Sequence, residues 1–301
     1  MIHAIITSYN EPKATLRAVK TILGQLGKKD KITIVDPFPE VEEILMKEIK
    51  DKRVDFFLDP GEGKSYALNL LFQERGTGKT EDIWVLTDGD VYVSDNAIKE
   101  IKKAFKDKKV GCVTGHPVAL NKNGSKFEYW SYVAFNGIDK TRKRLSDEKK
   151  FFECSGYLFA IRQGVISDFP LETSEDSIIP YLFWKKGYRI KYVGSAEVYV
   201  KNPDNWKDYL NQKVRNIKAH ENLNKIVKGM PRTKSLFNEI KEGALFAMLQ
   251  PRSFKELIWV IEFYFARLWI YIKAFMELKQ KKKYKDGWRE TEIKSTKPMD
   301  F

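Results

Sequence analysis

The first 120 residues alternate between short apolar runs and longer segments whose apolar residues recur with helical spacing. Runs rich in β-branched and aromatic residues predict strands at residues 3–9, 31–36, 53–59, 82–88 and 110–118. Segments with one apolar face predict helices at residues 11–26, 40–50, 65–74 and 94–105. Strands that alternate with helices in this way are typical of a doubly wound, parallel α/β sheet.

Acidic residues follow several of the predicted strands at the point where each strand ends. Asp36, Asp59 and Asp88 hold such positions, and Gly63 precedes the helix that follows the third strand. Ligands of open parallel sheets bind at the carboxyl ends of the strands. The sequence therefore predicts one crevice in which these residues converge.

The regular alternation stops after Pro117. Residues 127–145 predict a helix, and residues 151–162 predict a strand or a hairpin. Residues 174–193 predict a loop, a helix ended by Gly187 and a strand. From about residue 205 onward the pattern is basic and mostly helical. We therefore expect an α/β domain over residues 1–204 and a basic, mostly helical extension over residues 205–301.

The charge balance favours an anionic partner. Lys and Arg number 54 against 41 Asp and Glu, which gives a net charge of +13 at pH 7. Such a balance is typical of proteins that bind nucleic acid, a membrane surface or a phosphorylated ligand. The aromatic residues lie within apolar segments rather than between lysines, which argues against a nucleic-acid surface.

The cysteines and histidines give no metal or redox signature. Cys112 and Cys154 are far apart, which fits buried thiols in a reducing compartment, and His3, His116 and His220 are dispersed. His220, in a basic helix, is either a lone metal ligand or an exposed residue. The first ten residues lack the basic region and apolar core of a secretory signal, so a cytoplasmic protein is expected.

Two Gly-Lys-hydroxyl triplets, at residues 63–65 and 78–80, invite comparison with a Walker A loop. That loop requires a glycine five residues before the triplet, because its backbone amides must wrap around phosphates. Leu58 and Gln73 occupy these two positions, so neither triplet qualifies. The sequence therefore argues against a P-loop ATPase.

The segment Asp88-Gly89-Asp90 follows an almost continuously apolar strand. Two carboxylates separated by a small residue can both face a divalent cation, and hard oxygen ligands suit Mg²⁺ or Mn²⁺. Such an ion would neutralise a diphosphate and assist its departure. A turn rich in aspartate is the structural alternative.

A series of motifs in order resembles the family 2 glycosyltransferases, which have the GT-A fold. The motifs are AIITSYNEP (4–12), ITIVD (32–36), GKSYALN (63–69), VLTDGD (85–90), CSGYLFAIR (154–162) and residues 174–193. The resemblance covers roughly residues 1–200. It implies a mostly parallel, Rossmann-like sheet flanked by helices. It also implies inverting transfer of a sugar from a nucleoside diphosphate to a hydroxyl of a saccharide or a lipid-linked acceptor.

The resemblance also implies roles for individual residues. Asp176 would be the general base, and Asp88 and Asp90 would hold Mn²⁺ or Mg²⁺. Candidates for binding a UDP- or GDP-linked donor are Thr7, Tyr9, Asn10, Glu11, Asp36, Gly63, Lys64, Asn69, Asp88, Gly89 and Asp90. Candidates for contacting the acceptor or the diphosphate are Gly156, Glu175, Gln212 and Arg215.

Several of these residues have structural alternatives. Asp176 also suits the first turn of a helix, where acidic residues are favoured. Lys64 is equally compatible with a solvated surface. Gln212 and Arg215 share one helical face and resemble the Gln-x-x-Arg-Trp motif of processive members, but Asn216 replaces the tryptophan. A non-catalytic nucleotide-sugar-binding scaffold and a metal-dependent nucleotidyltransferase remain alternative functions.

The apolar segment 256–278 is long, but Glu262, Arg267, Lys273 and Glu277 interrupt it. Each central charge disfavours a membrane-spanning helix by roughly 2.5–3.5 kcal/mol. An amphipathic helix followed by the basic cluster at 279–285 suits the surface of a membrane. We therefore expect peripheral binding of residues 256–285 to the cytoplasmic face of a membrane, with a core-packing helix as the alternative.

Overall fold

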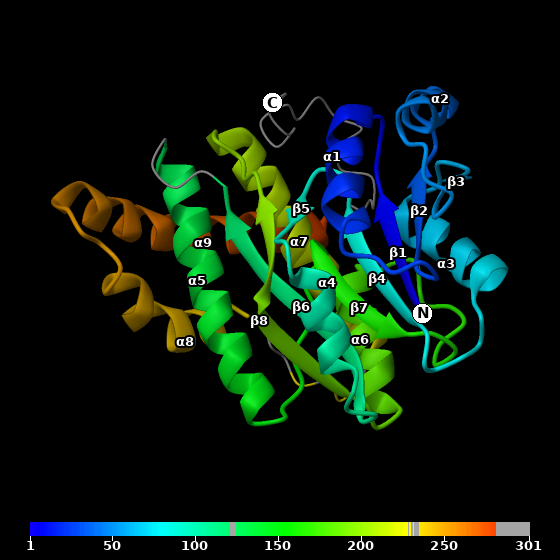
Figure 1. The fold of residues 1–301 in the computed structure, drawn as a ribbon. Coiled ribbons are helices and arrows are strands. Elements are labelled where there is room, and N and C mark those ends of the chain that lie inside the picture. The colour runs from blue at the N-terminus through cyan, green and yellow to red at the C-terminus, as the bar shows by residue number, and fades with distance from the viewer. Residues whose placement is uncertain (121–124, 228, 230, 232–234, 281–301) are drawn as a thin grey trace.

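The computed structural model describes residues 1–120, 125–227, 229, 231 and 235–280. Within these residues an eight-stranded sheet carries helices on both faces, and further helices follow toward the C-terminal end (Figure 1). The predicted architecture is confirmed: a mostly parallel α/β sheet flanked by helices, with helices following it.

The strands are β1 (Ile2–Thr7), β2 (Lys31–Asp36), β3 (Val54–Leu58), β4 (Ile83–Asp88), β5 (Tyr92–Val93), β6 (Val110–Ala119), β7 (Leu158–Arg162) and β8 (Arg189–Val200). The helices are α1 (Pro12–Leu23), α2 (Pro39–Glu48), α3 (Lys64–Arg75), α4 (Ala97–Ala104), α5 (Lys126–Asp147), α6 (Glu175–Lys185), α7 (Trp206–Ile226), α8 (Leu236–Met248) and α9 (Phe254–Lys279). Every strand and helix predicted for the first 120 residues is present, and the short strand β5 is additional.

The strand order is β3-β2-β1-β4-β7-β6-β8-β5. Strands β1 to β4 pair in parallel, and β6 pairs in parallel with β8. However, β7 lies antiparallel between β4 and β6, and β5 lies antiparallel to β8. The antiparallel direction of β7 and β5 was not predicted, because an apolar run predicts a strand without predicting its direction.

The core divides into two layers because successive side chains of a strand point to opposite faces of the sheet. Ile6 and Val85 belong to the layer that packs against α1, α2 and α4, whereas Ile5 and Leu86 belong to the layer that packs against α3 and α6. All four side chains are essentially inaccessible to solvent. The strands are thus fixed on both faces, and their carboxyl ends form a rigid edge.

A third apolar cluster joins α5, α7 and α9. Trp130 of α5 donates a hydrogen bond to the carbonyl oxygen of Trp259 in α9 at 2.6 Å. Helix α8 packs against both α5 and α9. Of the predicted extension over residues 205–301, residues 228, 230, 232–234 and 281–301 lie outside the described residues, and with them residues 281–285 of the basic cluster. No helix in the described part of the chain has the length and apolar character needed to cross a membrane.

Candidate active site

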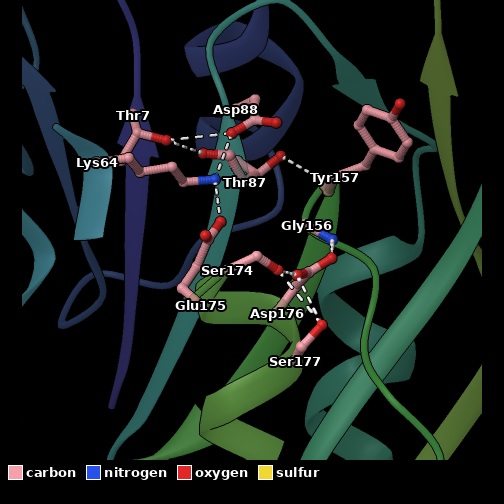
Figure 2. A network of polar contacts seen from close by, with 10 residues as sticks. All are labelled: Thr7, Lys64, Thr87, Asp88, Gly156, Tyr157, Ser174, Glu175, Asp176 and Ser177. Carbon is pink, nitrogen blue, oxygen red and sulfur yellow. Dashed lines mark hydrogen bonds and ion pairs between the residues drawn. The ribbon is translucent and has the colours of Figure 1, made fainter. Parts of the chain in front are cut away.

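A lysine and two carboxylates form an ion-paired cluster at the carboxyl end of β4 (Figure 2). Asp88 ends β4, Lys64 begins α3 and Glu175 begins α6. The Lys64 Nζ atom lies 2.7 Å from Asp88 Oδ1 and 2.6 Å from Glu175 Oε1. The hydroxyl of Thr7, at the end of β1, donates to Asp88 Oδ1 at 3.2 Å. This hydrogen bond joins the ends of β1 and β4.

The charge state of Lys64 follows from two opposing effects. Burial favours the neutral amine, but the carboxylates of Asp88 and Glu175 outweigh it and raise the pKa of Lys64 well above its ordinary value. Lys64 is therefore a fixed cation rather than a proton donor or acceptor. One cation against two carboxylates leaves the cluster with a negative charge, which a divalent cation can compensate.

The carboxylate of Asp176, in the first turn of α6, is oriented by hydrogen bonds on both of its oxygens (Figure 2). The backbone N–H of Gly156 donates to Oδ2 at 3.0 Å. The hydroxyl of Ser174, the N-cap residue of α6, donates to Oδ1, and that of Ser177 donates to the same oxygen at 3.4 Å. A carboxylate oriented in this way beside a cavity has the geometry of a general base.

Gly89 lies where the chain leaves β4 and approaches the loop after β1. Its N–H donates to the carbonyl oxygen of Thr7 at 2.7 Å. A Cβ atom at position 89 would lie 2.6 Å from the Cβ of Ser8 and 2.7 Å from Thr15 Oγ1. The residue between Asp88 and Asp90 must therefore be glycine for the two loops to touch.

Replacing Gly89 with alanine is expected to lower the free energy of unfolding by about 1–3 kcal/mol, the usual cost of overpacking. The measurement is urea denaturation of the purified protein. Gly24→Ala is the matched control, because its Cβ would meet its nearest atom at 3.8 Å and the residue is exposed. Equal stability of the two variants would contradict the close approach.

A cavity of about 550 Å³ opens beside these residues and runs toward the C-terminal helices. Most of the predicted site residues line it: Thr7, Tyr9, Gly63, Lys64, Asp88, Asp90, Gly156, Glu175, Asp176, Gln212 and Arg215. The structure therefore gathers residues from both sides of the predicted boundary at residues 204 and 205 around one space. The remaining predicted site residues do not line it: Asn10, Glu11, Asp36, Asn69 and Gly89.

Asp36 has no exposed surface, and its carboxylate holds the loops after β1 and β2. Its Oδ2 accepts hydrogen bonds from the hydroxyl of Ser8 and from the N–H of Asn10, and its Oδ1 accepts one from the N–H of Phe38. Burial raises the pKa of Asp36, while these hydrogen bonds oppose the rise. The bond to Asn10 supports a backbone angle φ of 53° at that residue, a left-handed conformation.

Asn69 and Glu11 also contact the protein rather than the cavity. The Asn69 amide donates to the carbonyl oxygen of Phe169 at 2.8 Å and accepts from its N–H at 3.1 Å. This pair of bonds fixes the loop before α6 against α3. Glu11 is buried at the N-terminus of α1, where its carbonyl oxygen accepts the hydroxyl of Thr15 at 2.8 Å.

Three residues outside the predicted set of substrate-contacting residues also line the cavity, namely Arg142, Glu153 and His220. Glu153 is 3% exposed, and its Oε2 lies 3.4 Å from Nδ1 of His220 in α7. The same His220 nitrogen lies 3.5 Å from the hydroxyl of Ser177. Arg142 of α5 donates to the carbonyl oxygen of Cys154 at 2.9 Å. A polar Glu-Cys-Ser segment within an apolar run is the only signal in the sequence that marked position 153.

Comparison with known proteins places the chain in a family. A family model described as "Glycosyltransferase like family 2" matches residues 2–219. The chain belongs to this family. The predicted resemblance is therefore confirmed, and the match covers every element from β1 to β8 and extends into α7.

Curated relatives include two kinds of polysaccharide synthase. The chain is 26% identical over 178 residues to hyaluronan synthase of Streptococcus pyogenes, which covers 55% of this chain and 41% of the relative. It is 26% identical over 221 residues to poly-beta-1,6-N-acetyl-D-glucosamine synthase of Staphylococcus aureus (strain COL), a match that covers 70% of this chain and 52% of the relative. The chain thus spans about half the length of these relatives.

A search of solved structures matched that of GalNAc-T7 with UDP, GalNAc and Mn²⁺. The two chains share 18% sequence identity with a TM-score of 0.48. The match covers 93% of this chain and 58% of the GalNAc-T7 chain.

The carboxylates of this family 2 domain are compatible with a divalent cation that is held partly by the protein and partly by phosphates of the substrate. Asp88 and Asp90 both line the cavity at the end of β4. Within the described ranges, no group of three or more His, Cys, Asp or Glu side chains is placed to hold a metal. Mg²⁺ is usually bound by one or two carboxylates together with phosphates of the substrate. The two aspartates therefore fit such an ion as partial ligands.

Proposed function

We propose that this chain is an inverting, metal-assisted glycosyltransferase that moves a sugar from a nucleoside diphosphate to a hydroxyl of its acceptor. The observation that supports the proposal most is the position of Asp176. Its oriented carboxylate shares one cavity with Asp88, Asp90 and Lys64, so a base for the acceptor and a binding site for the diphosphate of the donor lie in the same space. Membership of family 2 agrees with this chemistry.

In the proposed reaction Asp176 takes the proton of the acceptor hydroxyl while that oxygen attacks the anomeric carbon. The bond from the anomeric carbon to the diphosphate breaks, and the diphosphate leaves with the electron pair. A single attack of this kind inverts the configuration, since a second displacement would need a second carboxylate as nucleophile. The bonds from Gly156 and Ser174 hold the Asp176 carboxylate in place during the attack.

The diphosphate end of the site contains both fixed charge and metal ligands. Lys64 offers a cation near Asp88, and Arg215 lines the same cavity. Asp88 and Asp90 would hold Mn²⁺ or Mg²⁺, which stabilises the charge of a departing diphosphate when bound. We expect EDTA to prevent transfer, and the addition of Mn²⁺ to restore it.

The nucleoside of a UDP- or GDP-linked donor is proposed to lie at the ends of β1, β2 and β3. Tyr9 is 39% exposed at this end and packs edge-on against Phe38 at 5.1 Å between ring centroids. A held but exposed aromatic ring is suited to stacking on a base, an interaction worth about 1–3 kcal/mol. Pro37, Asp59 and Gly61 line the same part of the cavity.

A thermal-shift screen against UDP-, GDP- and TDP-sugars with Mn²⁺ tests the donor. A ligand that binds only the folded protein raises the midpoint of unfolding. We expect a shift with one nucleotide class and a smaller shift when Mn²⁺ is omitted. No shift with any nucleotide sugar would overturn the proposed function.

Helix α9 is proposed to lie on the cytoplasmic face of a membrane. Its exposed apolar residues recur at helical spacing and form a stripe, defined as Ile258, Ile261, Phe265, Leu268, Trp269, Ile272, Phe275 and Met276. Phe265 is 70% exposed and Trp269 is 50% exposed. Exposed apolar surfaces of this extent are typical of sites that bind a partner or a membrane.

Several charges that interrupt α9 are neutralised against the rest of the protein. Arg267 pairs with Glu239 of α8, and Glu277 pairs with Lys218 of α7 at 3.1 Å. Glu262 pairs with Lys126 at the start of α5 at 3.0 Å. The helix therefore presents its apolar side outward, and the net charge of +13 favours anionic lipid headgroups.

The double variant Phe265→Gln/Trp269→Gln is expected to reduce sedimentation with phosphatidylglycerol-containing vesicles at least tenfold, because it removes two large side chains from the stripe. Stability should change little, since both side chains are at least half exposed. Ile44→Gln/Leu58→Gln is the matched control, with exposed fractions of 48% and 50% on α2 and β3. Equal vesicle binding by both double variants would contradict a membrane role for α9.

A further inference from the structure

The cavity continues beyond the carboxylates between α5 and α8, and this part has a different chemical character. Its walls include Val133, Gly137 and Ile138 from α5 and Ile240, Gly243 and Phe246 from α8. We call this part the apolar arm. Helices α5 and α8 pack side by side along it (Figure 1). An apolar lining excludes water but leaves few groups that hydrogen-bond a sugar.

Two glycines keep the arm open. A Cβ atom at Gly137 would meet the Phe246 ring at 3.6 Å, whereas a Cβ atom at Gly243 would meet nothing within 4 Å. Both glycines lie inside helices, where glycine is less favourable than alanine. The unfilled volume beside Gly243 is therefore a place where a side chain would fit and a ligand can lie.

Two carboxylates beside the arm are paired with arginines. Glu239, which also lines the cavity, accepts from Arg267 Nε at 2.9 Å and from the hydroxyl of Tyr271 at 2.8 Å. Glu242 pairs with Arg144 of α5 at 2.8 Å. These carboxylates therefore do not require a cationic ligand, and the arm remains suited to an uncharged, apolar one.

The far side of α8 is apolar and exposed. Phe237, Leu245 and Leu249 are 73%, 75% and 74% exposed. Together with the stripe on α9, they make the helices around the arm apolar on their outer surface as well. An apolar chain that leaves the arm past α8 therefore meets an apolar surface rather than water alone.

We propose that the acceptor is an amphiphile whose hydroxyl-bearing head lies at Asp176 and whose apolar chain lies in the arm between α5 and α8. This inference rests on the proposed glycosyl transfer and names its substrate class. The inference rests on the continuity of the cavity, which joins the oriented carboxylate of Asp176 to the apolar walls at Gly137 and Gly243. A free saccharide would use the carboxylate end and leave the arm without a function.

The experiment measures binding of n-alkyl glucosides with chains of one, four, eight and ten carbons, each below its critical micelle concentration, by calorimetry in the presence of the donor nucleotide and Mn²⁺. If the chain enters the arm, affinity should rise about fourfold per buried methylene group until the arm is filled. Equal affinity for the methyl and octyl compounds would identify a water-soluble acceptor and overturn the proposal.

Gly243→Phe fills the arm, and we expect it to lower the gain in affinity of the octyl over the methyl compound at least tenfold. Gly243→Ala is the matched control and should keep most of that gain. Gly137→Leu fills the arm from the α5 side, so the test remains if one variant fails to fold. An unchanged dependence on chain length in both filling variants would show that the chain binds elsewhere and overturn the proposal.

The donor-induced thermal shift is measured on the same variants and separates this inference from the proposed function. Gly243 lies on α8 and a Cβ atom there would meet nothing within 4 Å, so we expect the shift with the nucleotide sugar to be the same as in the unmodified protein. A protein with a donor shift but no dependence on chain length refutes only the amphiphilic acceptor. A protein with no donor shift refutes the glycosyltransferase itself.

Discussion

Replacing Asp176 with asparagine is expected to lower the rate of sugar transfer by about 100- to 10,000-fold, which is the contribution of a positioned general base. Asparagine has nearly the shape of aspartate, and its amide oxygen can still accept the bond from Gly156 while its amide nitrogen can donate to the hydroxyl oxygen of Ser174. It cannot take a proton from the acceptor. The measurement is the initial rate of nucleotide release with saturating donor and acceptor.

Binding and stability measurements distinguish a base from a helix-capping residue. Asp176 lies in the first turn of α6, where a negative charge stabilises a helix by about 0.3–1 kcal/mol. If that were its whole role, Asp176→Asn would lose this stability and keep its activity. We expect the reverse, with the donor-induced thermal shift retained and transfer lost. Ser174→Ala is the control, since it removes one orienting bond and should lower the rate far less.

An undiminished rate in Asp176→Asn would remove the base from the mechanism. The non-catalytic nucleotide-sugar-binding alternative predicts a different result, namely a donor-induced thermal shift without nucleotide release even in the unmodified protein. A metal-dependent nucleotidyltransferase would instead release pyrophosphate or form a new phosphate ester. Identification of the released product by phosphorus NMR separates these outcomes.

The early strands could be predicted because their apolar runs are continuous and their helices have one clear apolar face. The run at β4 shows this well, since Trp84 and Val85 face opposite layers of the core and both are buried. Its position in the sheet is less accessible to prediction. The antiparallel insertion of β7 between β4 and β6 depends on contacts between segments that are distant in the chain.

The site could be predicted in part for the same reason. Asp88 follows β4 directly, so its place at the strand edge comes from local pattern and topology. In contrast, the contact of Lys64 with Glu175 depends on how α6 packs against α3 and β4, which no local spacing encodes. Asp36 also lies at a strand end, but its carboxylate accepts hydrogen bonds from the loops after β1 and β2, which no local pattern encodes, and its contact with the donor stays a prediction.

Replacing Lys64 with methionine is expected to lower both stability and activity. Removing one partner of a buried ion pair costs about 3–5 kcal/mol, and we expect about 2 kcal/mol here because Lys64 is 23% and Asp88 is 27% exposed. The rate of transfer should fall about 100-fold, as for other fixed groups that stabilise developing charge. Urea denaturation and initial rates measure the two effects separately.

The double variant Lys64→Met/Glu175→Gln, compared with Lys64→Met, distinguishes a structural lysine from a functional one. Glu175 has an 8% exposed side chain, so neutralising it relieves the buried charge that the first substitution leaves behind. Stability should therefore recover by about 1–2 kcal/mol relative to Lys64→Met, as expected for residues in contact. Activity should not recover, because the cation is still missing. If the double variant recovered both stability and activity, Lys64 would be a structural residue. If Lys64→Met lost neither stability nor activity, Lys64 would be an ordinary exposed surface lysine.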